Sequence, residues 1–427
     1  MHDQSDDSLA DGRPRDTLRQ LLKNRNYAFY VGVRVAQMLG LSISSAAIMW
    51  QVYEITLSPL ALAFVGIARF VPSLAISFLA GAVTDTRDRR LVLGLSQLAP
   101  ILVSTVLGAL TLTGGISVGW IYAGVGLLGI AGAFESPSRQ ALLPLVVPRE
   151  SFQRAVSVAT IVHQLAGVFG PALAGLTIAR YGVAPAYFFH VLLVVGGVVC
   201  LACIRIAATA GTGGGLSLAM VKEGLRFVWA NPPILGAMAL DMFAVIFAGA
   251  DALLPIYAKD ILGVGAAGFG LLTSSKAVGS LAAALMMAFL PPIVATGRWL
   301  VIMIGLFGLG TVAFGLSTWF PLSLVLYGLI AAFDQVSVVL RQSIIQLGTP
   351  DALRGRVGSV NQVFVGASNQ LGATESGLVA AWANSAVFAV VFGGIGCVAA
   401  VVVIAAMLPS LWRHRLNVRE EAPAPAR

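Results

Sequence analysis

The sequence predicts an all-α polytopic membrane protein with twelve transmembrane helices in two pseudo-symmetric six-helix halves. Three observations predict this fold class: a series of apolar segments, a one-sided distribution of positive charge, and an internal repeat. A bilayer core of about 30 Å needs about 20 helical residues, and every apolar segment reaches that length. The segments are 26–54, 59–84, 91–113, 117–140, 152–179, 184–206, 233–258, 264–290, 297–318, 321–347, 355–383 and 385–409.

Positive charge marks one side of these segments. With the N-terminus placed in the cytosol, 22 of the 27 Lys and Arg residues fall on the cytosolic side, in loops, in tails or near the cytosolic ends of spans. Two, Arg180 and Lys259, fall outside, and three, Arg34, Arg69 and Lys276, lie within predicted spans. Because cationic loops resist translocation, we expect a multi-pass protein of the cell (inner) membrane with both termini in the cytosol.

Composition narrows the class of protein. The chain is 58% hydrophobic and 11% charged, with a mean hydropathy of +0.88, and has no soluble stretch long enough to bury its own core. Its net charge of +8 is spread over short loops, so the expected partner is the anionic inner leaflet of the lipid bilayer and not nucleic acid. The three cysteines fall inside predicted spans, so neither a disulfide framework nor a metal site is expected.

The two halves share a weak repeat at an offset of 202 residues. An even number of spans per copy gives both copies the same orientation, which suits a transporter with its site between the halves. The identical pairs are Arg139 with Arg341, Gln140 with Gln342, Pro148 with Pro350, Arg154 with Arg356, Ser157 with Ser359, Gly170 with Gly372 and Gly175 with Gly377. The predicted division is a cytosolic tail (1–25), a six-helix half (26–206), a linker with an amphipathic helix (207–232), a second half (233–410) and a cytosolic tail (411–427).

The loop after the second span carries Gly81, Asp85, Arg89 and Arg90. It resembles the signature of the major facilitator superfamily in this loop, Gly-x-x-x-Asp-Arg-x-Gly-Arg-Arg. The resemblance implies that Gly81 packs closely against span 11, and that Asp85 forms a charge cluster with Arg89 and Arg90 that latches the outward-facing state. The chain departs from the signature at Thr86 and Asp88. The alternative is that the arginines only set orientation and that Asp85 caps a helix.

Span 5 carries Gly167, Gly170, Pro171 and Gly175, where glycines permit close helix packing and the proline permits a bend. This pattern resembles the Gly-Pro motif of drug/proton antiporters. The segments 53–62, 68–72 and 136–144 are similar to the branch of the superfamily that contains the enterobactin exporter and macrolide efflux proteins. The resemblance covers essentially all twelve spans, and it implies the major facilitator fold and proton-driven export of a bulky amphipathic molecule such as a drug, macrolide or siderophore.

Intramembrane acids are the candidates for proton coupling. A charge at mid-bilayer costs about 2.5–3.5 kcal/mol, so it normally faces a partner or a watery cavity. In the resembled fold spans 1, 4, 7 and 10 line the central cavity, and the acids on these spans are Asp334, Asp251, Asp241 and Glu135. Asp334 is the first choice because it lies about 20 Å deep along span 10. Alternatively, each acid is a permanent partner of Arg34, Arg69 or Lys276.

The leading interpretation is a monomeric secondary exporter that exchanges protons for a small-molecule substrate. No phosphate-binding loop, metal set or clustered nucleophile and base is apparent, so no cofactor and no enzymatic activity are expected. A uniporter or importer on the same fold and a non-transporting membrane sensor remain as alternatives. The candidates for lining the substrate cavity are Arg34, Gln37, Tyr122, Phe243, Tyr327 and Gln335.

Overall fold

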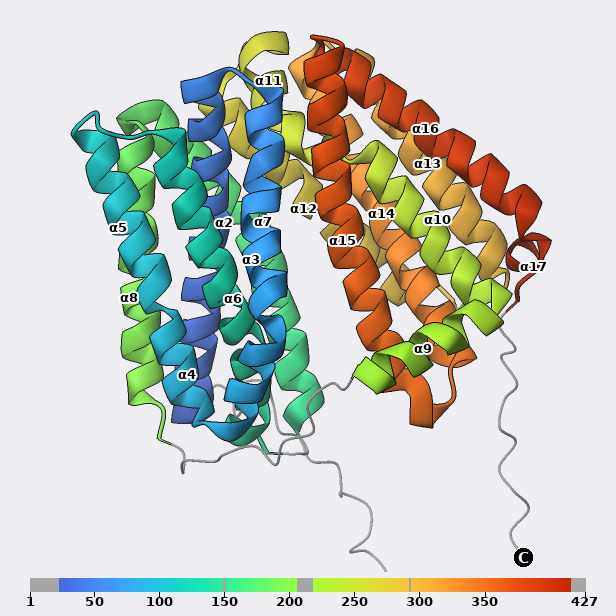
Figure 1. Ribbon diagram of the computed structural model, residues 1–427, viewed down its shortest axis with the longest axis horizontal. Helices are drawn as coiled ribbons and strands as arrows, with labels where there is room; N and C mark the ends of the chain where they lie inside the picture. The colour runs from blue at the N-terminus through green and yellow to red at the C-terminus, as the bar shows by residue number, and fades with distance from the viewer. Residues whose placement is uncertain (1–22, 149–150, 206–217, 292, 416–427) are drawn as a thin grey trace, which may run out of the picture.

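The computed structural model describes residues 23–148, 151–205, 218–291 and 293–415, and in this part of the chain it confirms the predicted all-α architecture (Figure 1). The N-terminal half contains α2 (Arg25–Thr56), α3 (Pro59–Thr86), α4 (Arg89–Ser96), α5 (Leu98–Leu112), α6 (Val118–Val146), α7 (Phe152–Tyr181) and α8 (Val183–Cys203). The C-terminal half contains α10 (Pro232–Ala248), η2 (Ala250–Leu253), α11 (Leu254–Ile256), η3 (Tyr257–Ile261), α12 (Gly265–Phe289), α13 (Thr296–Leu316), α14 (Phe320–Gly348), η4 (Asp351–Leu353), α15 (Arg354–Trp382), α16 (Ala386–Met407) and α17 (Pro409–Trp412).

Eleven spans of the described residues are long and apolar enough to cross a membrane, counting α4 with α5 and α10 with η3 as single spans. The remaining predicted span, the eleventh in chain order (355–383), corresponds to α15, which has 29 residues but a more polar sequence that includes Asn361, Asn369, Gln370 and Glu375. Helix α15 packs against α3, α10 and α16, so neighbouring helices shelter much of its polar surface. Such sheltering lets a polar helix lie within a membrane bundle.

The seventh span is interrupted just past its middle. Helix α10 ends at Ala248, and Gly249 leaves the helical region with φ −74° and ψ 71°. The hydroxyl of Ser376 on α15 donates to the carbonyl oxygen of Gly249 at 2.9 Å. Because a neighbouring helix satisfies this backbone oxygen, the break is tolerated inside the membrane bundle. The interruption places Asp251 on the short 3₁₀ turn η2, at the centre of the molecule.

Two glycines of the internal repeat make equivalent contacts inside their own halves. A Cβ atom on Gly170 of α7 would lie 2.4 Å from the Cβ of Ser42 on α2. A Cβ atom on Gly372 of α15 would lie 2.3 Å from the carbonyl oxygen of Val245 on α10. Span 5 therefore packs on span 1 as span 11 packs on span 7, which is the correspondence that a duplication predicts.

The other pair of repeated glycines joins the halves to each other. A Cβ atom on Gly175 of α7 would lie 2.9 Å from the Cα of Gly270 on α12. A Cβ atom on Gly377 of α15 would lie 2.5 Å from the Cβ of Ala63 on α3. We call these two contacts the Gly175 contact and the Gly377 contact. Small residues on both sides let the helix backbones approach closely where the halves meet.

The halves meet at one end of the molecule and diverge at the other. Helices α3 and α15 lie close in the upper part of Figure 1 and separate below. At the joined end the Tyr53 hydroxyl donates to the Asp260 carboxylate, and the Lys259 ammonium lies 5.7 Å from the centre of the Tyr53 ring. Near the other end, a Cβ atom on Gly81 would meet no atom within 4 Å. The expected close packing of Gly81 against span 11 is thus absent from this conformation, and it stays a prediction for the state in which these ends meet.

Helix α9 (Leu218–Ala230) crosses the lower end of the C-terminal half (Figure 1). Val228 is fully buried, Trp229 is exposed, and Glu223 forms a 2.6 Å ion pair with Arg356 of α15. This helix therefore packs partly on protein. Of the predicted tails, residues 1–22 and 416–427 lie outside the described residues. The C-terminal tail was predicted to begin at 411, but Leu411 is fully buried in the C-terminal half.

Candidate functional site

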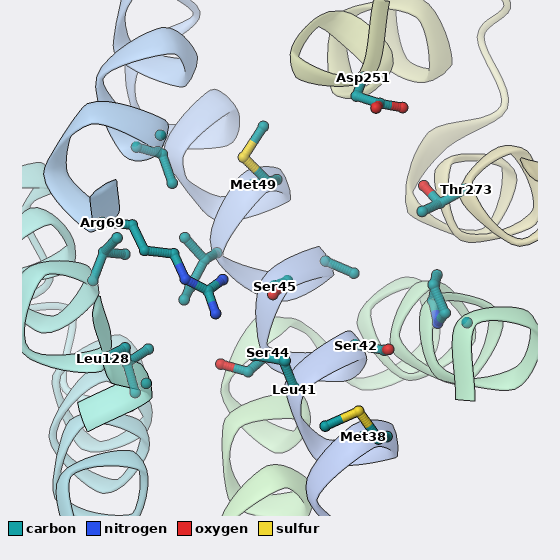
Figure 2. Close-up of a pocket in the computed structure, with 18 of the residues that line it drawn as sticks. Met38, Leu41, Ser42, Ser44, Ser45, Met49, Arg69, Leu128, Asp251 and Thr273 are labelled. Atoms are coloured by element: carbon teal, nitrogen blue, oxygen red, sulfur yellow. The ribbon is translucent and has the colours of Figure 1, made fainter. Parts of the chain in front are cut away.

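A cavity of about 820 Å³ lies between the halves. It is lined from the N-terminal half mainly by α2, α3, α6 and α7, and from the C-terminal half by η2, α12, α14 and α15. Met38, Leu41 and Met49 on α2 and Phe269 on α12 give it flexible and aromatic apolar surface (Figure 2). The volume falls in the range of pockets that hold drug-sized ligands, about 300–1,000 Å³.

The predicted lining residues divide into two groups. Gln37 and Gln335 line the large cavity, and Tyr327 lines a second cavity of about 80 Å³ beside it. Arg34, Tyr122 and Phe243 lie outside the lining of both cavities. Arg34 donates to the carbonyl oxygen of Ala159 at 3.2 Å and Tyr122 donates to that of Ala61 at 2.9 Å, while 38% of Phe243 is exposed. These three candidates do not line a cavity in this conformation, because a span number does not specify the face on which a residue lies.

Asp251 lines both cavities, and a lysine and a tyrosine bind its carboxylate. Its carboxylate forms an ion pair with Lys276 of α12 and accepts a hydrogen bond from the Tyr327 hydroxyl of α14. From the sequence alone it stayed open whether an intramembrane acid is a permanent partner of Lys276. Asp251 is the acid that pairs with Lys276. Because the cluster combines a cation, a carboxylate and a hydroxyl at a cavity wall, it can hold or pass a proton.

Asp334 lines the small cavity together with Lys276, Tyr327 and Asn369. No ion pair or side-chain hydrogen bond to its carboxylate occurs within the described ranges. The charges of Lys276, Arg341 and Asp251 all act on it. Asp334 therefore lies in the interior of the C-terminal half without a fixed counterion, next to the Asp251 cluster.

Asp241 has a different environment from the other candidates. It forms an ion pair with Arg341 of α14, and the two residues are only 5% and 4% exposed. Neither residue lines the two cavities. Arg341 was counted among the cytosolic cations, and it lies inside α14, seven residues before the end of that helix at Gly348. The assignment of Asp241 to the cavity is therefore wrong, and the pair links α10 to α14 inside the half.

Glu135 lines the large cavity, and an arginine on the same helix neutralises its charge. Arg139, one turn further along α6, forms a 2.6 Å ion pair with it and also lines the cavity. Arg139 occupies the repeat position of Arg341, but Leu39 stands on α2 where the second half has Asp241. Arg139 and Arg341 are thus equivalent in the repeat, but Arg139 pairs with an acid on its own helix and Arg341 pairs with an acid on another helix.

The arginines of the predicted latch bind backbone oxygens at the ends of neighbouring helices. Arg89 donates to the carbonyl oxygen of Ala141 at 3.1 Å and Arg90 to that of Ala202 at 3.1 Å. Asp88, one of the two departures from the signature, caps α4 by accepting from the backbone N–H of Arg90 at 2.8 Å. The side chain of Asp85 lies outside the described part of the chain. These contacts tie the loop to its own half in this conformation.

Other residues of the large cavity were not predicted, among them Arg69, Ser44, Met38, His163 and Thr273. Their helices are apolar on nearly every face, so periodicity does not separate a lipid-facing side from a cavity-facing side. The intramembrane charge of Arg69 was the available signal. Figure 2 shows its side chain extending from α3 into the cavity toward α2, with Asp251 and Thr273 across the space.

Two six-helix halves around a central cavity define a secondary transporter. Residues 22–426 match a family described as transmembrane secretion effector, and the chain belongs to this family of the major facilitator superfamily. It is 26% identical to the multidrug efflux pump Tap of Mycolicibacterium fortuitum, over 80% of this chain and 86% of that protein. It is 35% identical to the staphyloferrin A transporter of Staphylococcus aureus, over 34% of this chain and 36% of that protein.

Solved structures show the same fold. A bacterial homologue of the iron transporter ferroportin, in an inward-facing state, matches with a TM-score of 0.69 and 16% identity, over 91% of this chain and 98% of that one. A bacterial homologue of the lysosomal transporter Spinster matches with a TM-score of 0.62 and 15% identity, over 90% of this chain and 96% of that one.

Proposed function

We propose that this protein is a proton-driven exporter of bulky amphipathic small molecules that works as a monomer in the cell (inner) membrane. The observation that carries the proposal is the large cavity, which combines thioether and aromatic surface with charged groups and lies between two halves joined at one end. Such a lining suits substrates with a large apolar body and a few polar groups. The similarity to an efflux pump and to a siderophore transporter supports the same substrate class.

The distribution of positive charge supports an orientation with both termini in the cytosol. In that orientation the joined end, with Tyr53 and Asp260, faces outward, and the diverging end faces the cytosol. Substrate would then enter from the cytosol in this conformation. Release follows a rearrangement that joins the cytosolic ends and separates the outer ends.

Proton entry can drive the export step. A proton that falls through about 100 mV supplies about 2.3 kcal/mol, which corresponds to roughly fifty-fold accumulation of a neutral solute. Asp334 and the cluster of Asp251, Lys276 and Tyr327 are the proposed proton-exchange groups because they adjoin the cavity. The proposed cycle contains no chemical step and needs no nucleotide.

The test is transport by the purified protein in proteoliposomes that carry an imposed proton gradient. We expect at least one member of a panel of siderophores, macrolides and lipophilic ions to be concentrated, with proton movement in the opposite direction. Protein-free liposomes and a protonophore provide the controls. Transport that is indifferent to the protonophore would instead indicate a uniporter, and a panel that binds without moving would favour a sensor.

A further inference from the structure

Arg69 differs from the other cations that line the large cavity. Arg139 is paired with Glu135, and Lys276 is paired with Asp251. Arg69 has no hydrogen bond or ion pair within the described ranges, and the one acid whose charge reaches it, Glu135, is already bound by Arg139. A cation inside a membrane protein normally has a partner, so an unpaired guanidinium at a cavity wall indicates a place for an anion.

The backbone of Arg69 is held firmly in place. A Cβ atom on Gly129 of α6 would lie only 2.2 Å from the carbonyl oxygen of Arg69, so α3 and α6 are in backbone contact at this level. Pro72 lies one turn further along α3 and removes the donor for the carbonyl of Ala68. The backbone that carries Arg69 is thus fixed by its contact with α6, and its side chain extends into the cavity (Figure 2).

Two buried polar side chains on α2 supply an independent observation. Ser44 is 2% exposed and Gln37 is 5% exposed, and both line the large cavity. The Ser44 hydroxyl and both polar atoms of the Gln37 amide have no hydrogen-bond partner within the described ranges. Buried polar groups in native proteins are nearly always paired with protein or water, so these atoms are free of protein partners and available to a polar ligand. Figure 2 shows Ser44 on the side of α2 toward which Arg69 extends.

We propose that Arg69, Ser44 and Gln37 form a binding site for a carboxylate of the substrate, so that the transported molecules are amphipathic acids. This inference rests on the proposed function and names its substrate class. A planar guanidinium can donate two parallel hydrogen bonds to one carboxylate, while a hydroxyl and an amide N–H can bind its remaining lone pairs. The apolar body of the acid would lie against Met38, Leu41 and Met49 on the same helix.

The test compares binding of matched pairs of probes to the purified full chain in nanodiscs. The first pair is pyrenebutyric acid and its methyl ester, and deoxycholic acid and its methyl ester are the second. We expect the wild type to bind each acid on the order of tenfold more tightly than its ester. Arg69→Gln should abolish this preference through weaker acid binding, with ester binding unchanged. Ser44→Ala should reduce the preference partly, and Arg154→Gln, which removes an exposed arginine outside the cavity, should leave it intact.

The outcomes separate the two proposals. If the wild type binds acids and esters equally, or binds no acid, the carboxylate site is overturned. If Arg69→Gln weakens acid and ester alike, Arg69 is only structural and the inference also fails. Arg69→Lys keeps the charge, so it should retain part of the preference should Arg69→Gln not fold. If the acids bind with the expected preference but are not transported in proteoliposomes, the site stands and the proposed function fails.

Discussion

Asp251 and Asp334 line the same small cavity, but their charges are held differently. Asp251 has both a cation and a hydroxyl bound to it, whereas Asp334 has neither within the described ranges. Once Asp334 has lost its proton, it can form a direct ion pair with Lys276 only if Lys276 gives up its ion pair with Asp251. Exchange of Lys276 between the two acids is a physical way to link a proton to a change in helix contacts.

Asp334→Asn should therefore abolish uphill transport and leave substrate binding in place. The amide has nearly the shape of the protonated acid but cannot release a proton. Accumulation against a gradient should fall to the level of protein-free liposomes, with the substrate Kd within about threefold of the wild type. Asp351→Asn, at the exposed N-terminus of η4, is the control and should transport normally. An Asp334→Asn protein that still concentrates substrate would exclude Asp334 and direct the test to Asp251.

Residue roles were harder to predict than residue positions. Sequence placed Asp241 and Asp334 correctly in membrane spans, but the partner of Asp241 is Arg341, 100 residues away. That pairing depends on how α10 and α14 cross, which the local sequence does not contain. Arg341 also resembles a loop cation because it lies near the end of a long apolar run. Only the packing of the helices distinguishes Asp241, which is paired with Arg341, from the acids that line the cavities.

At the scale of elements, glycines determine where the helices touch. The Gly175 contact brings the backbones of α7 and α12 together across the two halves. Adding atoms at such a site forces the helices apart, and overpacking costs about 1–3 kcal/mol. A larger side chain at this site should therefore destabilise the conformation in which α7 and α12 are packed together.

Gly175→Val should accordingly lower transport at least about fivefold, since a loss of 1 kcal/mol or more shifts a conformational equilibrium by that factor. The matched control is Gly196→Val on α8, where a Cβ atom would meet nothing within 4 Å. Initial transport rates at equal protein levels provide the measurement. Equal effects of the two substitutions would show that the Gly175 contact has no special part in the cycle.

Most elements could be predicted because apolar runs, polar breaks and the 202-residue repeat can be recognised in the sequence without knowing how the helices pack. The sequence did not predict the interruption of the seventh span at Gly249. That break is stable because Ser376, far along the chain, satisfies the exposed carbonyl oxygen. It also did not predict which faces line the cavity, because a helix that is apolar all round carries little information about its neighbours.

At the scale of the whole molecule, orientation decides which compartment the cavity serves. A single cysteine at Gly115 in a cysteine-free protein should react with an impermeant maleimide added to intact cells, because Gly115 is exposed in the connection between α5 and α6. A cysteine at Thr86, exposed at the end of α3, should react only after the cells are opened. Labelling efficiency on gels measures both. The reverse pattern would invert the topology, and the cavity would then open to the outside in this conformation.

The Gly175 and Gly377 contacts together limit how the halves can move. Two points of contact define a line. If the halves move as rigid bodies and keep both contacts, they can only rotate about that line. The contact between Tyr53 and Asp260 also links the two halves at the joined end. If a swing about this line closes the lower gap, we expect the contacts of Tyr53 with Asp260 and Lys259 to open at the same time.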